Sequence, residues 1–215
     1  IMSLLKKEIE GMSLINNFIT NIEEINLLQH IYKNNWDTTI KRRVQHYGIK
    51  FEYKYRKIEE SKPVDFFPEW LNIIVKKLKT ISCLSNFNPN QCTINEYIPG
   101  TGIAPHIDTH SCFGNTIVSL SLENDIIMYF QNKITNNSRI PTHLLSKSLL
   151  ILQGKSRYCY SHGITARKTD TFSDKLVKRK KRVSITFREI KFSPCYCEWK
   201  SLCDSQDGIL EKTRL

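Results

Sequence analysis

One triplet, His106-Ile107-Asp108, has the residue types and spacing of a metal-ligand pair. In an extended segment, residues two apart point to the same face, so one imidazole and one carboxylate can bind a single ion. A third ligand must come from a distant segment, and His162 is the candidate. Two histidines and one carboxylate that leave coordination positions open form the ligand set of non-haem iron oxygenases. We therefore expect His106, Asp108 and His162 to bind iron.

Two arginines follow His162 at a spacing that suits a carboxylate-binding strand. Arg182 and Arg188 are six residues apart, and an even spacing places both side chains on one face of a strand. A dicarboxylate cosubstrate needs such fixed guanidinium groups. Asn95 and Tyr97, two apart and shortly before the triplet, could point into the same interior. Considered singly, Arg188 is more typical of a surface ion pair and Asn95 of a turn. Considered together, these residues favour an oxygenase.

A second cluster of metal-binding residue types lies near the C-terminus, at Cys195, Cys197 and Cys203. Structural zinc takes four tetrahedral ligands, so a fourth is needed. His110 is the candidate, because it lies two residues beyond Asp108 and is too far along to share the iron. From spacing alone, three unpaired structural cysteines are an equal alternative.

The segment from Lys41 to Tyr55 mixes basic and aromatic residues in a way that is typical of single-stranded nucleic-acid binding. The candidate substrate-binding residues are Arg42, Arg43, His46 and Tyr47, and the aromatic run continues through Phe51, Tyr53 and Tyr55. The alternative is an ordinary β-hairpin with core aromatics. We expect Tyr47 and Phe51 to be partly core and the arginines to face outward. A second basic run, at 178–182, leads into the arginine strand at the expected mouth of the site.

Length, charge and the distribution of apolar residues indicate which partners and which cellular compartment to expect. The 215 residues suit one domain, and 32 Lys and Arg against 21 Asp and Glu give a net charge of +11 and a pI near 9.3. This charge is equally typical of a polyanionic partner and of a lysine-rich solvated surface. The first residues carry charges where a secretory signal needs an apolar core, and no stretch reaches the ~18 apolar residues of a membrane span. We expect a monomer without membrane contact, in the reducing cytoplasm or nucleus. Because Ile1 precedes Met2, we also expect a piece of something longer.

Helices are expected only in the first third of the chain. Thr20 and Glu23 form a capping box that opens a helix to about Lys33. Its apolar face is predicted to contain Ile22, Ile25, Leu28 and Ile31. Pro68 starts a second helix, in which Leu71, Ile74, Val75 and Leu78 follow the helical period.

From residue 92 onward the pattern predicts short strands. They are expected at 92–98, 116–122, 125–131, 148–153, 156–161 and 183–190. The polar run 132–139 is predicted to be an exposed hairpin loop, and 170–181 a charged loop. Helices followed by many short strands predict an α+β, mainly β protein: a double-sheet β-roll, or jelly roll, with helices on one flank. Within one globular domain we expect N-terminal helices and a substrate lid at 1–90, a catalytic core at 91–192, and a Cys-rich, zinc-binding tail at 193–215.

At these residues the sequence resembles the AlkB family of dioxygenases. The matching stretches are INEYIPGTGIAPHIDTH, VSLSL, SRYCYSHGI, RVSITFR and RRVQHYGIKFEY, which together span about Lys41 to Cys203. The resemblance implies a double-stranded β-helix. It also implies iron(II) at His106, Asp108 and His162, with the distal carboxylate of 2-oxoglutarate held by Arg182 and Tyr97. Arg188 and Asn95 would lie near the iron-chelating end of that cosubstrate.

The stretches HIDTHSCF, GKSRY, SHGI and SPCYC-EWKSL-CDSQ are similar to the branch that hydroxylates a modified wobble uridine of tRNA. This implies a substrate of the 5-methoxycarbonylmethyluridine type, tRNA as partner, and zinc held by His110, Cys195, Cys197 and Cys203. In animals, members of that branch also carry an RNA-recognition domain and a methyltransferase domain, neither of which lies in these 215 residues, so a separate tRNA methyltransferase is a further candidate partner. Two alternatives stay open: a demethylase of nucleic-acid bases, and a non-catalytic, zinc-stabilised RNA-binding module.

Overall fold

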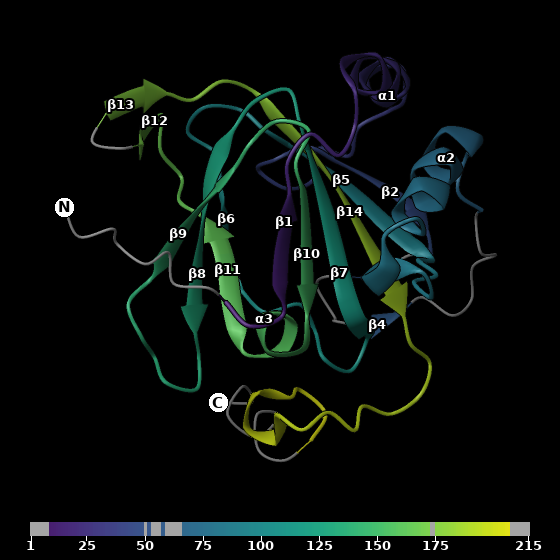
Figure 1. The fold of residues 1–215 in the computed structure, drawn as a ribbon, viewed down its shortest axis with the longest axis vertical. Coiled ribbons are helices and arrows are strands. Elements are labelled where there is room, and N and C mark those ends of the chain that lie inside the picture. The colour runs from purple at the N-terminus through teal and green to yellow at the C-terminus, as the bar shows by residue number, and fades with distance from the viewer. Residues whose placement is uncertain (1–8, 50, 53–56, 59–65, 173–174, 207–215) are drawn as a thin grey trace.

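Two antiparallel sheets face each other in the computed structural model, which describes residues 9–49, 51–52, 57–58, 66–172 and 175–206. The larger sheet has the strand order β1-β10-β7-β14-β5-β2, and the smaller one has the order β6-β11-β8-β9 (Figure 1). The strands of the larger sheet are β1 (Met12–Ile15), β2 (Val44–Gly48), β5 (Gln91–Tyr97), β7 (Phe113–Leu122), β10 (Leu149–Gln153) and β14 (Arg182–Ile190). Those of the smaller sheet are β6 (Ile103–His106), β8 (Ile126–Asn132), β9 (Ile140–Leu144) and β11 (Tyr160–Ile164). The predicted mainly β roll is confirmed.

Strand β14 shows how the sequence divides its side chains between two faces. Its apolar residues Val183, Ile185 and Phe187 join the core beneath the helices. The alternate residues, which line the cavity between the sheets, are Arg182, Ser184, Thr186 and Arg188. The predicted placement of both arginines on one face is therefore confirmed, and that face points inward.

Helix α1 (Asn21–Lys33) begins at the predicted capping box, but its buried face differs from the prediction. Leu27 is buried. Of the four predicted apolar residues, Ile31 is buried as well and Leu28 packs against the core, as predicted, but Ile22 and Ile25 are 72% and 54% exposed. The reason is polar: the Glu24 carboxylate accepts hydrogen bonds from the backbone N–H of Glu123 and the hydroxyl of Ser146. These bonds turn the acidic side of the helix toward the sheet and leave the two isoleucines outside.

Helix α2 (Glu69–Leu78) follows Pro68 and buries Leu71, Ile74 and Leu78, as the helical period predicted. Both helices pack on the outer face of the larger sheet, to the right in Figure 1. A 3₁₀ turn, η1 (Ser82–Leu84), and a short strand pair, β3 (Phe51–Glu52) with β4 (Lys57–Ile58), complete the first part of the chain. Among the described residues, no helix is long and apolar enough to span a membrane.

Two predictions for the later part of the chain are wrong. Residues 156–161 are not one strand, because Gly154 (φ 50°) opens a short helix, α3 (Gly154–Tyr158), before β11 begins. The segment 170–181 is not simply a charged loop, because it forms the hairpin β12 (Thr169–Phe172) and β13 (Lys175–Lys178). Buried Asp170 anchors the hairpin by accepting hydrogen bonds from Arg167 and Arg179.

The expected segment boundaries do not follow the sheets. Strands β1 and β2, from the segment expected to form helices and lid, pair with β10 and β5 at the two edges of the larger sheet. The stretch 133–139 connects β8 to β9 as an exposed loop, which confirms the predicted hairpin. After β14 the tail runs below the sheets and contains a 3₁₀ turn, η2 (Lys200–Leu202) (Figure 1).

Candidate active site

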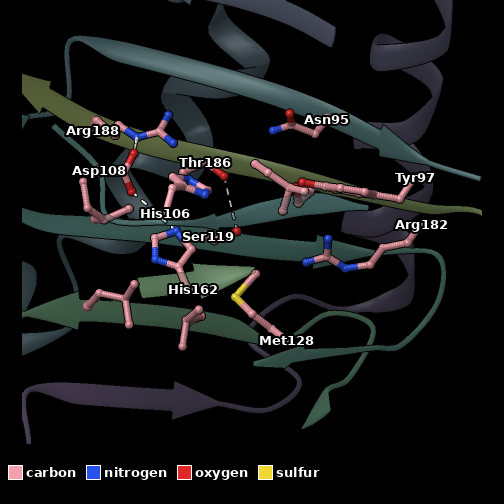
Figure 2. A pocket seen from close by; sticks show the side chains of 15 residues that line it. Asn95, Tyr97, His106, Asp108, Ser119, Met128, His162, Arg182, Thr186 and Arg188 are labelled. Carbon is pink, nitrogen blue, oxygen red and sulfur yellow. Dashed lines mark hydrogen bonds and ion pairs between the residues drawn. The ribbon is translucent and has the colours of Figure 1, made fainter. Parts of the chain in front are cut away.

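The three predicted iron ligands meet at one end of the cavity between the sheets (Figure 2). His106 on β6 and His162 on β11 are direct cross-strand partners, and their ring centroids are 4.6 Å apart. Asp108 follows β6, with Oδ2 3.6 Å from Nε2 of His162. One potential ligand atom from each residue lies within 4.8 Å of the others, so the predicted convergence is confirmed.

Hydrogen bonds orient two members of this group from outside it. Nδ1 of His106 lies 2.9 Å from the carbonyl oxygen of Ala104, which leaves Nε2 as the lone-pair donor when Nδ1 carries the proton. Nε of Arg188 donates to Oδ1 of Asp108 at 2.9 Å. Oδ2 of Asp108 is buried and has no hydrogen-bond partner within the described residues. The unused oxygen fits a carboxylate that ligates a cation through one atom.

The electrostatics keep these side chains in their metal-binding forms. Burial alone would raise the pKa of Asp108, but neighbouring cationic groups, Arg188 first among them, outweigh it and hold that pKa well below its usual range. Burial, together with repulsion from His106, lowers the pKa of His162 to about 3. Near neutral pH, the site therefore offers a carboxylate anion and a neutral His162 imidazole, the forms that bind a metal ion.

Arg182 stands at the opposite end of the same cavity (Figure 2). It is 1% exposed, and its Nη2 donates to the Ser121 hydroxyl at 2.8 Å. Its Nε and Nη1 are buried without a hydrogen-bond partner in the described structure. An unpaired buried guanidinium edge costs free energy unless an acceptor arrives, and a carboxylate matches its geometry. Burial lowers the pKa of Arg182 to about 10, so it remains a cation at neutral pH.

Asn95 and Tyr97 on β5 also line this cavity, as predicted. Tyr97 pairs across the strands with Arg182, whose guanidinium carbon lies 5.4 Å from the Tyr97 ring centroid. The side-chain oxygen of Asn95 accepts a hydrogen bond from Nε of Arg42 at 2.9 Å. The walls between the two ends of the cavity combine apolar side chains (Ile117, Met128, Leu150 and Leu152) with the hydroxyl groups of Ser119, Ser184 and Thr186.

Sequence reasoning missed Arg157, a buried cation beside the site. It is 2% exposed, and its guanidinium donates to four backbone carbonyls, two in the segment that connects β6 to β7 and two at the start of β7. One of these is the carbonyl of Asp108, 2.7 Å from Nη1. Arg157 therefore fixes the backbone that carries the carboxylate. The stretch GKSRY contained it, but nothing in the pattern separated it from a surface arginine.

Of the four candidate substrate-binding residues, Arg42 lines a second hollow that opens onto the ligand group. This hollow, the mouth, is lined by Arg42, Thr93, Asn95, Ile103, Ala104, His106, Ile107, Asp108, Thr109, Phe113 and Arg188.

The other three candidates have different surroundings. Arg43 pairs with the buried Glu96 and packs against Trp36, whereas the half-buried Tyr47 packs edge-on against Trp70. His46 is exposed and lies 3.3 Å from the Thr93 hydroxyl. The predictions for the Phe51 side chain and for residues 53 and 55 fall outside the described residues.

The cysteine tail folds back onto the segment after Asp108. Ligand atoms of His110, Cys197 and Cys203 lie within 4.8 Å of one another. Cys195 falls outside that set, but it is buried and lies close enough to Cys197 and Cys203 to influence the pKa of both thiols. Asp204 accepts hydrogen bonds from the backbone N–H groups of His110 and Ser111, which ties the tail to this segment.

Comparisons with known proteins agree with this arrangement. The family model described as the 2OG-Fe(II) oxygenase superfamily matches residues 11–188. The chain is 38% identical to tRNA (carboxymethyluridine(34)-5-O)-methyltransferase alkbh8 of Xenopus tropicalis, over 94% of the chain but 35% of that protein. It is 35% identical to the alkylated DNA repair protein ALKBH8 homolog of Arabidopsis thaliana, over 94% of the chain and 64% of that protein. The chain thus spans about a third of the first relative and just under two thirds of the second.

A solved structure, that of OsALKBH1, has the same fold. It matches with a TM-score of 0.66 and covers 83% of this chain and 96% of its own. The sequence identity of this pair is 20%, so the likeness concerns the arrangement of the two sheets.

Proposed function

The chain belongs to the 2OG-Fe(II) oxygenase superfamily, and we propose that it hydroxylates a modified wobble uridine of tRNA, of the 5-methoxycarbonylmethyluridine type. It is a 2-oxoglutarate-dependent dioxygenase, with iron(II) and 2-oxoglutarate as the cofactor and cosubstrate of its family. The observation that carries the site assignment is the pairing, in one cavity, of a metal-ligand group with an unpartnered buried arginine.

His106, Asp108 and His162 would hold the iron. The fit rests on the unused oxygen of Asp108 and on the neutral state of His162. When bound, iron(II) and 2-oxoglutarate supply the oxidising power: dioxygen gives one atom to succinate, carbon dioxide is released, and a substrate C–H becomes C–OH. Arg188 fixes the orientation of the Asp108 carboxylate.

Arg182 and Tyr97 would hold the distal carboxylate of 2-oxoglutarate. The two unpartnered nitrogens of Arg182 fit a carboxylate, and cavity-lining Tyr97 lies against the guanidinium. Arg188 and Asn95 line both the cavity and the mouth, which supports a place near the iron-chelating end of the cosubstrate. The cosubstrate would thus lie along the cavity, with the mouth left for the base to be oxidised.

The substrate proposal rests on the mouth and on the relatives. An unstacked loop base costs little free energy to splay out, and the cationic Arg42 beside the ligand group suits a polar substituent. The relative from Xenopus tropicalis is named for a carboxymethyluridine of tRNA. We assign Arg42 to direct substrate contact and Arg43, His46 and Tyr47 to the support of that segment. A separate tRNA methyltransferase would act on the same nucleoside.

The tail would hold a structural zinc ion through His110, Cys195, Cys197 and Cys203. Two thiols and one imidazole lie close together, with the buried Cys195 on the same tail, and thiolates with an imidazole are a donor set that zinc prefers. Burial lowers the pKa of His110 to about 4, so the ring is neutral and can ligate. Such a site would fasten the tail to the segment that follows Asp108.

A side-by-side assay tests the substrate. The enzyme is incubated with iron(II), ascorbate and 2-oxoglutarate, and with either tRNA bearing 5-methoxycarbonylmethyluridine or methylated single-stranded DNA. We expect a tRNA nucleoside heavier by one oxygen atom and no formaldehyde from the DNA. Efficient formaldehyde release with unchanged tRNA would instead identify a base demethylase. Absence of succinate under all conditions, with metal and cosubstrate bound, would favour the non-catalytic RNA-binding alternative.

A further inference from the structure

A third hollow lies on the outer face of the smaller sheet, next to the mouth. Along β8 and β11, Met128 and His162 line the inner cavity, whereas their neighbours Tyr129 and Gly163 line this outer hollow. The hollow shares Ile103 and Ala104 of edge strand β6 with the mouth. A chain that leaves the mouth can therefore pass over the β6 edge into the hollow.

The hollow is cationic. Lys41 and Arg139 line it, both are exposed, and neither makes a hydrogen bond or ion pair within the described residues. No acidic side chain occurs among its described lining residues. Exposed Lys168 lies beside it, with its Cγ 3.9 Å from the position of a Cβ on Gly100. Unpaired cations around a hollow fit an anion, and repeated cations fit a polyanion.

Two glycines in the lining of the hollow are required by the packing of the chain itself. A Cβ on Gly102 would lie 2.1 Å from the carbonyl oxygen of Ile164, and one on Gly163 would lie 2.9 Å from the backbone of Pro105. Both positions therefore require glycine, which lets the backbone around β6 and the backbone of β11 approach each other closely beneath the hollow.

One wall of the hollow is Tyr129, which contacts Arg167. Nη2 of Arg167 donates to the Tyr129 hydroxyl at 2.8 Å, and the guanidinium carbon lies 5.6 Å from the Tyr129 ring centroid. Nε of Arg167 is held by the buried Asp170. Aromatic rings and guanidinium planes are the groups on which unpaired bases stack.

We propose that this outer hollow binds single-stranded RNA, holding the phosphates of nucleotides that flank the base in the mouth. Lys41 and Arg139 bind the backbone, and Tyr129 with Arg167 offers a stacking face. The consecutive residues Lys41 and Arg42 line the hollow and the mouth respectively, so one strand can contact both. The inference deepens the proposed function and rests on it for the identity of the flipped base, but RNA binding is measurable without turnover.

The test compares two double variants with the same loss of charge. The first, called the groove variant, combines Lys41→Ala with Arg139→Ala and removes both cations that line the outer hollow. The control is Lys33→Ala with Lys76→Ala, two exposed lysines on the helical flank. Binding of a short, fluorescently labelled single-stranded RNA is followed by anisotropy at several salt concentrations, and thermal melting checks that both variants fold.

We expect the groove variant to bind about tenfold more weakly than the control. Its plot of log affinity against log salt should be flatter than that of wild type by roughly 1.4, or about 0.7 for each lost phosphate contact. Equal weakening by both variants would mean that only net charge matters and would overturn the proposal. Wild-type affinity in the groove variant would overturn it too. If RNA binding depends on Lys41 and Arg139 but the tRNA uridine is not oxidised, the proposed function is refuted and the RNA-binding role of the hollow is retained.

Discussion

The two arginines of β14 lie on one face of the strand, but they differ in whether their guanidinium groups have a partner in the protein. Arg188 is paired with Asp108, whereas two nitrogens of Arg182 have no partner among the described residues. Their even spacing predicted the shared face. It could not predict which of the two pairs with a carboxylate of the protein, because that depends on the position of Asp108 after β6.

The Arg182→Ala variant should need roughly 10- to 100-fold more 2-oxoglutarate for half-maximal succinate formation. The substitution removes a charge-assisted hydrogen bond to a buried carboxylate, worth about 1.5–3 kcal/mol. Steady-state succinate production at a range of cosubstrate concentrations measures the effect.

Lys181→Ala is the control for this change. Lys181 precedes Arg182 but pairs with Glu123 on the other side of the strand, away from the cavity. Equal increases in the two variants would show that Arg182 acts only as part of a surface charge run.

At the scale of elements, the segment between β6 and β7 is held from two sides. Arg157 of α3 donates to its carbonyls, and the tail docks on His110 and Ser111. The sequence predicted the tail contact through the cysteine spacing and the family resemblance. It did not predict the role of Arg157, because every residue type has a backbone carbonyl and the sequence of the acceptor residues therefore does not reveal the hydrogen bonds.

Arg157→Met should lower the free energy of unfolding by on the order of 3 kcal/mol. The change keeps most of the side-chain volume but strands several buried carbonyl groups without a donor. Urea unfolding measures it. Lys155→Met on the same helix removes only an exposed pair with Glu10 and should leave stability unchanged. Similar losses in both variants would show that helix α3, not the Arg157 hydrogen bonds, sets the effect.

Purified protein should contain about one zinc ion per chain in addition to iron, and Cys197→Ser should lose it. Metal analysis gives the content, and thermal melting should fall with the metal, since binding couples to folding. Cys83→Ser changes an exposed cysteine outside the cluster and should retain both. Full stability without zinc would identify the cluster as three structural cysteines.

Other elements show where local pattern fails. The i, i+3 apolar residues of α1 predicted one buried face, but only its later part is buried, because Glu23 pairs with Lys77 and Glu24 accepts hydrogen bonds from the loops that follow β7 and β9. Asp170 lies in a charged stretch, and its local sequence pattern predicts a solvent-exposed loop. Its two arginine partners bury it and turn the stretch into a hairpin. In both cases distant ion pairs or hydrogen bonds override a local periodicity.

For the whole molecule, strand periodicity was sufficient to predict the double sheet, because alternate residues on β7 and β14 separate a helix-covered face from a cavity face. The net charge of +11 could not be interpreted from composition. The structure places two unpaired cations, Lys41 and Arg139, around one hollow beside the mouth, whereas Lys76 on the helical flank pairs with Glu69. Part of the positive charge is therefore unpaired and lies beside the mouth, where we propose that RNA binds.

We propose that a tRNA uridine is oxidised at the mouth of the cavity between the sheets, with dioxygen and 2-oxoglutarate. Mass spectrometry of tRNA nucleosides after reaction under isotopically labelled dioxygen tests this, with wild type beside Asp108→Ala. We expect one labelled oxygen atom in the uridine derivative, an equal amount of succinate, and neither product from the variant, which lacks the only anionic ligand. Labelled product at the wild-type rate from Asp108→Ala, or product oxygen derived from water, would contradict the proposal.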